Sequence, residues 1–79
     1  MENKEILQKL AEIFKTILND SDLEINENTT FDDLENWDSV IQMMIVATIE
    51  KEFNVKFKLM EIATINTIKE YIDAIKTKQ

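Results

Sequence analysis

The 79-residue sequence predicts an all-α protein: a small bundle of three long helices and one short helix, with a long acidic loop between helices one and two. Two observations predict this fold class. Apolar residues recur at steps of three and four over three separate segments, as they do on the buried face of an amphipathic helix. The chain is also short enough to be filled by one hydrophobic core, so we expect a single domain over residues 1–79.

The first predicted helix covers residues 2–18. A broad apolar stripe runs along this segment, with charged and polar residues between its members. The stripe consists of Ile6, Leu7, Leu10, Ile13, Phe14, Ile17 and Leu18. Residues 19–22 are Asn, Asp, Ser and Asp, whose side chains hydrogen-bond to nearby backbone and favour turns. They should end the helix.

Residues 23–37 form a long connection, and loops of this length in compact domains are usually functional or disordered. Apolar residues are scattered along it, at Leu23, Ile25, Phe31 and Leu34. They predict that the connection packs across the helices. Thr30 is expected to cap a short turn over residues 31–34, because the acids in that turn suit the positive end of a helix.

The second long helix is predicted over residues 38–53. Its expected core face has members four residues apart, widened by two neighbours: Ile41, Ile45, Ile49 and Phe53, with Val46 and Ala47. The sequence contains neither Gly nor Pro. Asn54 is therefore expected to end this helix in the left-handed conformation that Gly would otherwise adopt.

Beyond this helix, residues 56–58 should be extended and residues 59–63 should form one or two helical turns. The last helix is predicted over residues 66–76, capped by Thr64 or Asn66. Its inward residues should be Ile68, Tyr71, Ile72 and Ile75. The predicted core of the whole bundle contains Leu10, Phe14, Ile45, Ile49, Phe53, Ile68 and Ile72.

The composition argues against several classes of function. Histidine and cysteine are absent, which removes the commonest general base and thiolate metal sites, so we expect neither an enzyme nor a metal centre. A net charge of −7 argues against a nucleic-acid partner. No signal peptide or membrane-spanning stretch is evident. We expect a cytoplasmic monomer that does not insert into membranes.

The sequence Asp38-Ser39-Val40 at the start of the second helix is the strongest functional signal. Eight acidic residues lie between Asp20 and Asp38, with no Lys or Arg among them. A helix N-terminus stabilises a phosphate group, so a serine there is well placed to carry a phosphate-linked group. The structural alternative is that Asp38 and Ser39 only cap the helix, which is worth about 1 kcal/mol.

The order of these features resembles the acyl carrier protein family over essentially the whole chain. The resemblance rests on Asp38-Ser39-Val40 after an acidic loop, and on the sequence EKEFNV (50–55) at the end of the second helix. It implies that Ser39 bears 4′-phosphopantetheine in phosphodiester linkage and that Asp38 helps present it. The thiol of this arm would hold an acyl group as a thioester and shuttle it between biosynthetic enzymes.

Two departures from the family pattern narrow the interpretation. Gly commonly stands before the Asp-Ser pair and after the helix-ending Phe, where this chain has Asn36-Trp37 and Asn54. The second helix, usually rich in exposed acids, has only Glu50 and Glu52. This favours a specialised carrier dedicated to one pathway. An aminoacyl or peptidyl carrier with the same arm, and an unmodified helical adaptor, remain alternatives.

The implied partners are a phosphopantetheinyl transferase and enzymes that activate or transfer acyl groups. A partner-reading stripe is predicted beside the core face of the second helix, at Val40, Met43, Met44 and Ala47, with Trp37 next to it. Methionine tolerates many packing geometries, which suits a surface that meets several enzymes. The alternatives are that the methionines thicken the core and that Trp37 only packs against the helix start.

Overall fold

The computed structural model describes residues 2–79 and consists of four α-helices and one short 3-10 turn. These are α1 (Asn3–Leu18), η1 (Phe31–Asp33), α2 (Ser39–Phe53), α3 (Leu59–Thr64) and α4 (Ile68–Lys78). Within residues 2–79 the only extended pairing is an isolated bridge between Thr30 and Thr67. The predicted all-α bundle of three long helices and one short helix is confirmed.

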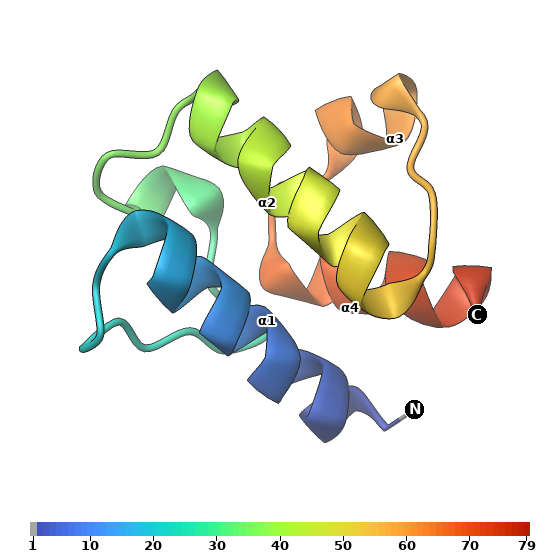
Figure 1. Ribbon diagram of the computed structural model, residues 1–79, viewed down its shortest axis with the longest axis horizontal. Helices are drawn as coiled ribbons and strands as arrows, with labels where there is room; N and C mark the ends of the chain where they lie inside the picture. Colours follow the sequence, from blue (N-terminus) through green and yellow to red (C-terminus); the bar gives the residue numbers. More distant parts are fainter. Residues whose placement is uncertain (1) are drawn as a thin grey trace.

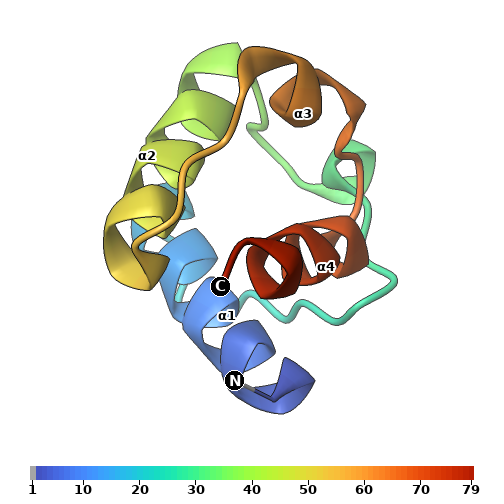
Figure 2. The ribbon, with the colours of Figure 1, turned by 90° about the vertical axis from the view of Figure 1, so that its right-hand side faces the viewer.

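The helices surround one common interior. In Figure 1, α1 and α2 run in opposite directions across the same side of the molecule. Figure 2 shows α3 above α4 on the other side, with α4 next to α1. Both ends of the chain lie on the right-hand side of Figure 1, and Lys76 Nζ donates a hydrogen bond of 2.7 Å to Asn3 Oδ1. None of the helices described is long and apolar enough to span a membrane.

The interior is filled by one cluster of buried side chains that includes all seven predicted core residues. Two predictions for α2 need correction. Ile41 is only half-buried, as it lies in the first turn, and Ala47 is exposed. Successive residues of a helix are about 100° apart, so a face that buries Ile45 and Val46 turns Ala47 outward. The cluster contains Ile6, Leu10, Ile13, Phe14, Phe31, Ile45, Val46, Ile49, Phe53, Val55, Ile62, Ile65, Ile68, Tyr71, Ile72 and Ile75.

Asparagine occupies the backbone positions at which many proteins place glycine. Asn19 ends α1 with φ 54°. Asn54 ends α2 with φ 56°, which is the left-handed conformation predicted for it. A third, Asn36, has φ 63° in the loop shortly before α2. The left-handed region is costly for most residues, but Asn enters it because its short polar side chain can hydrogen-bond locally.

The start of α4 differs from the prediction. Its cap is Thr67, whose Oγ1 accepts a hydrogen bond of 3.2 Å from the Glu70 N–H, and neither Thr64 nor Asn66 has this role. The carboxylate of Glu70 in turn accepts from the Asn66 N–H at 3.1 Å. A Thr with a Glu three residues later is a capping-box pattern. It moves the helix start to Ile68.

The loop between α1 and α2 is tied to the start of α4 by backbone hydrogen bonds. Phe31 N–H donates to Asn66 O at 3.1 Å, and Ile68 N–H donates to Thr29 O at 3.1 Å. Its apolar residues pack onto the core, as predicted, with Phe31 buried and Leu23, Ile25 and Leu34 half-buried. Thr30 precedes η1 as predicted, but its side chain accepts no hydrogen bond from the backbone N–H groups of η1. Its hydroxyl instead donates to Asp33 Oδ2 at 2.8 Å.

Tyr71 is fully buried in the core, and within residues 2–79 its hydroxyl has no hydrogen-bond partner of ordinary geometry. Burial disfavours the phenolate, and this raises the pKa of Tyr71 from 10.0 to about 12, although the nearby Gln42 amide opposes the rise in part. Between those two pH values the unfolded chain releases the phenolic proton first. The free energy of unfolding should therefore fall as the pH rises through this interval.

Tyr71→Phe removes both the unpaired hydroxyl and this titration. We expect the variant to be at least as stable as the parent at neutral pH, because a buried hydroxyl without a partner costs about 1–3 kcal/mol. It should also lose less stability than the parent between pH 10 and 12. The free energy of unfolding of both proteins, measured with a denaturant across this pH range, tests this. The lysines titrate in both proteins, so the difference between the two curves reports the tyrosine. A loss above about 1 kcal/mol at neutral pH would contradict it.

Candidate functional site

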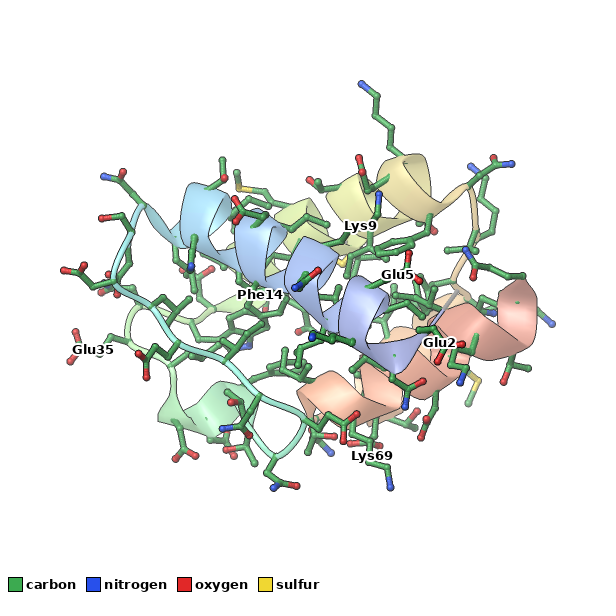
Figure 3. All side chains as sticks on the ribbon, turned by 90° about the horizontal axis from the view of Figure 1, so that it is seen from below. Glu2, Glu5, Lys9, Phe14, Glu35 and Lys69 are labelled. Carbon is green, nitrogen blue, oxygen red and sulfur yellow. The ribbon has the colours of Figure 1, made fainter. Side chains whose placement is uncertain are left out.

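The start of α2 is held in place by a stack of aromatic rings. The Trp37 ring lies 4.7 Å from the Phe31 ring and 5.8 Å from the Phe14 ring, measured between centroids, and is nearly parallel to the latter at 8°. Figure 3 shows Phe14 pointing from α1 into the interior. Ring pairs at these separations add about 0.5–1.5 kcal/mol each to the burial of their surface. The stack fixes the residue immediately before Asp38.

Asp38 is the N-cap of α2. Its backbone is extended, and Oδ1 accepts a hydrogen bond of 2.8 Å from the Ile41 N–H. Its carbonyl oxygen accepts from the Gln42 N–H at 2.9 Å, which begins the helical ladder. The capping alternative considered for the Asp-Ser pair therefore describes Asp38 well.

Ser39 is the first residue of α2 and its side chain is exposed. No hydrogen bond from its hydroxyl to any other group of residues 2–79 is found, so the helix does not use this hydroxyl as a cap. The first backbone N–H groups of a helix have no intrahelical acceptor. Asp38 accepts the hydrogen bond of the Ile41 N–H. The N–H groups of Ser39 and Val40 therefore remain available to an anion at the helix start.

The acidic loop provides a negative surface beside this helix start. Of its eight acids, all but the half-buried Glu27 are exposed. Glu35, shortly before the helix, points away from the protein in Figure 3. Within residues 2–79, no three acidic side chains converge in a way that would hold a metal ion. The loop is a charged, solvated surface next to Ser39.

An apolar surface lies on the other side of Ser39. Val40 is 68% exposed, and Met43 and Met44 are 48% and 49% exposed, so the methionines do not form the core. With Ala47 they line a shallow depression that includes Ser39. Trp37 differs from these four residues, because it is half-buried in the aromatic stack.

Two further exposed apolar residues on α3 were not predicted from the sequence. Leu59 and Met60 are 74% and 81% exposed, the highest values among the large apolar residues. Leu59 lines a groove of 220 Å³ between α2 and α3 together with Met43. A helix this short buries one side only, here Ile62. The signal in the sequence was the pair of apolar residues between Lys58 and Glu61.

Charged contacts attach α3 to the end of α4. Lys78 Nζ lies 2.8 Å from a Glu61 carboxylate oxygen and 5.2 Å from the centre of the Phe57 ring. The hydrogen bond from Lys78, with a second from the Lys58 backbone, lowers the pKa of Glu61 below its usual value. These contacts attach Glu61 of α3 to the end of α4, while Leu59 and Met60 stay exposed.

Comparison with known proteins agrees with this geometry. The family model described as "Phosphopantetheine attachment site" matches residues 8–75. The fold is similar to the solution structure of a holo acyl carrier protein from Geobacter metallireducens, with a TM-score of 0.84 and 25% identity, covering 92% of this chain and 84% of that one. It is also similar to the crystal structure of an acyl carrier protein from Thermotoga maritima, with a TM-score of 0.85 and 29% identity, covering 99% and 91%.

No functionally curated protein matches the chain by sequence. The family model, however, covers α2 and α3 in full and most of α1 and α4, and it includes the helix start that carries Ser39. Proteins of this family are carriers rather than enzymes, and their cofactor is 4′-phosphopantetheine. The chain belongs to the phosphopantetheine attachment site family.

Proposed function

We propose that this protein is an acyl carrier whose 4′-phosphopantetheine arm is attached to Ser39. The observation that carries the proposal is the exposed Ser39 hydroxyl at the first position of α2, which the helix itself does not use. Ser21, the other serine of the chain, lies in the loop away from any helix start. A phosphodiester on Ser39 would meet the unpaired N–H groups and the positive end of the α2 dipole.

The attachment requires little chemistry from the carrier. A transferase would move the phosphopantetheine group from coenzyme A to Ser39: the bond from Oγ to phosphorus forms, the bond to the departing adenosine phosphate breaks, and the hydroxyl proton passes to the transferase. The chain has no histidine that could take this proton. Once attached, the arm supplies a thiol that holds the acyl group as a thioester. The carrier's residues orient the serine and are recognised by enzymes.

The enzymes that act on Ser39 should dock on the apolar surface beside it. Val40, Met43, Met44 and Ala47 line the depression that contains the serine, and α2 has no acid in its first turn. The acidic loop borders this area. We infer that each partner presents an apolar recess next to a basic rim, since opposite charges steer association.

The resemblance of the fold to acyl carrier proteins favours an acyl cargo over an aminoacyl cargo. The scarcity of acids on α2 supports a carrier dedicated to one pathway. The monomeric state and the cytoplasmic location expected from the sequence stay predictions.

Loading with the arm tests the attachment residue. Incubation with coenzyme A and a promiscuous phosphopantetheinyl transferase should raise the intact mass by one phosphopantetheine group. Ser39→Ala should abolish this gain without changing the helix content, because the serine hydroxyl makes no hydrogen bond within residues 2–79 that would stabilise the helix. Ser21→Ala is the matched control and should load like the parent. A mass gain that persists in Ser39→Ala would refute the assignment.

Two substitutions of Asp38 separate its charge from its capping role. Asp38→Asn keeps an oxygen that accepts from the Ile41 N–H, whereas Asp38→Ala loses it and should lose about 1 kcal/mol of stability. If the charge helps the transferase to approach, both variants should load more slowly at low salt, and the difference from the parent should shrink at high salt. If Asp38→Asn loads like the parent at every salt concentration, the residue is only a cap.

Met44→Glu tests the partner surface. Because Met44 is half exposed, the variant should keep the melting temperature of the parent. A charge forced into an apolar contact should raise the KM of the transferase about tenfold, which corresponds to about 1.4 kcal/mol. Met44→Leu is a control for the loss of the methionine side chain without a new charge. Gln8→Glu is a control that places the same negative charge at an exposed position of α1, away from Ser39. A large fall in the melting temperature with unchanged loading would assign Met44 to the core instead.

A further inference from the structure

The methionines of this chain are distributed in an unusual way. The chain has four methionines and no cysteine, and the three that the structure describes, Met43, Met44 and Met60, are all exposed. None belongs to the buried cluster of residues 2–79. All the sulfur atoms in the described part of the chain are therefore on its surface.

Two of these residues lie beside Ser39, and the third follows Leu59, a residue of the adjoining groove between α2 and α3. Met43 and Met44 line the depression that contains Ser39. Met43 also faces the groove between α2 and α3 opposite Leu59, the neighbour of Met60. Met60 is the most exposed of the three at 81%. All three side chains are thus accessible to solvent, and those of Met43 and Met44 belong to the depression that contains Ser39.

We propose that Met43, Met44 and Met60 form an oxidation-sensitive modification site that switches off docking at Ser39 while the fold persists. The oxidant is a peroxide. A sulfur lone pair attacks one peroxide oxygen, the bond from sulfur to oxygen forms and the bond between the oxygens breaks. The second oxygen leaves as water or an alcohol with the peroxide proton. Sulfur is oxidised to the sulfoxide and the peroxide is reduced.

The physical effect would be local. The sulfoxide is polar and accepts hydrogen bonds strongly, so covering it with an apolar recess leaves it unsatisfied. Because the three side chains are exposed, the core loses nothing when they are oxidised. Enzymes that reduce methionine sulfoxide would restore the thioether. This inference rests on the proposed function only in that it takes the surface beside Ser39 to be the docking surface.

The experiment uses the full-length chain before the arm is attached, because the arm's own thiol would also react with peroxide. The chain is treated with hydrogen peroxide, freed of it, and loaded by a phosphopantetheinyl transferase with coenzyme A. Peptide mapping should find one oxygen atom on each of the three methionines. We expect kcat/KM for loading to fall at least about tenfold, the melting temperature to stay unchanged, and methionine sulfoxide reductases to restore loading.

A matched variant, Met43→Leu/Met44→Leu/Met60→Leu, keeps the surface apolar and cannot be oxidised there. The kcat/KM of this variant for loading, whatever its value before treatment, should be the same after peroxide, although the variant retains Met1 and Trp37. Equal loss in this variant would place the sensitive group elsewhere and overturn the inference. Unimpaired loading of the fully oxidised parent, resistance of the three methionines to peroxide, or loss of loading through unfolding would each overturn it too. Failure of the untreated parent to load would instead refute the proposed function itself.

Discussion

The stack of Phe14, Phe31 and Trp37 is the contact on which the functional geometry depends. Phe14 comes from α1, Phe31 from the loop and Trp37 from the residue before the α2 cap. Tyr71 of α4 continues the stack, with its ring 5.4 Å from that of Phe31. The long connection is therefore held by α1 and α4 through aromatic packing, and by α4 also through backbone hydrogen bonds. Without these contacts Ser39 would stand at the end of a free loop.

The absence of glycine places a second constraint on the same region. The chain must turn left-handed before α2 and at the ends of α1 and α2, and it uses Asn at all three points. Asn36 lies two residues before the cap, so its φ of 63° sets the direction in which the chain enters the aromatic stack. An L-residue with a larger side chain would pay about 1–2 kcal/mol for this conformation. At Asn36 and Asn54, near the positions where the family commonly has glycine, asparagine thus adopts the left-handed backbone conformation that glycine would allow.

The surface around Ser39 is divided into two parts of different chemistry. The loop side is acidic and solvated, while the side formed by α2 and the start of α3 is apolar. Long-range charge attraction speeds the approach of a basic partner, whereas apolar contact governs how long it stays. This division suits a carrier, which must find enzymes quickly and release them after each transfer. It also explains why an exposed stripe of methionines is tolerated on so small a protein.

The sequence by itself determined the helices, the core and the serine at the helix start, because these depend on periodicity and local capping that neighbouring residues decide. The buried positions from Leu10 to Ile72 and the left-handed Asn54 follow from such local rules. Tertiary structure decided what depends on distant partners. The loop is paired with the first turn of the last helix by backbone hydrogen bonds, and Trp37 packs into the molecule because the rings of Phe14 and Phe31 lie beside it. Likewise Leu59 and Met60 are exposed because the packing of α3 uses Ile62, a choice of face that a six-residue helix is too short to reveal in its sequence.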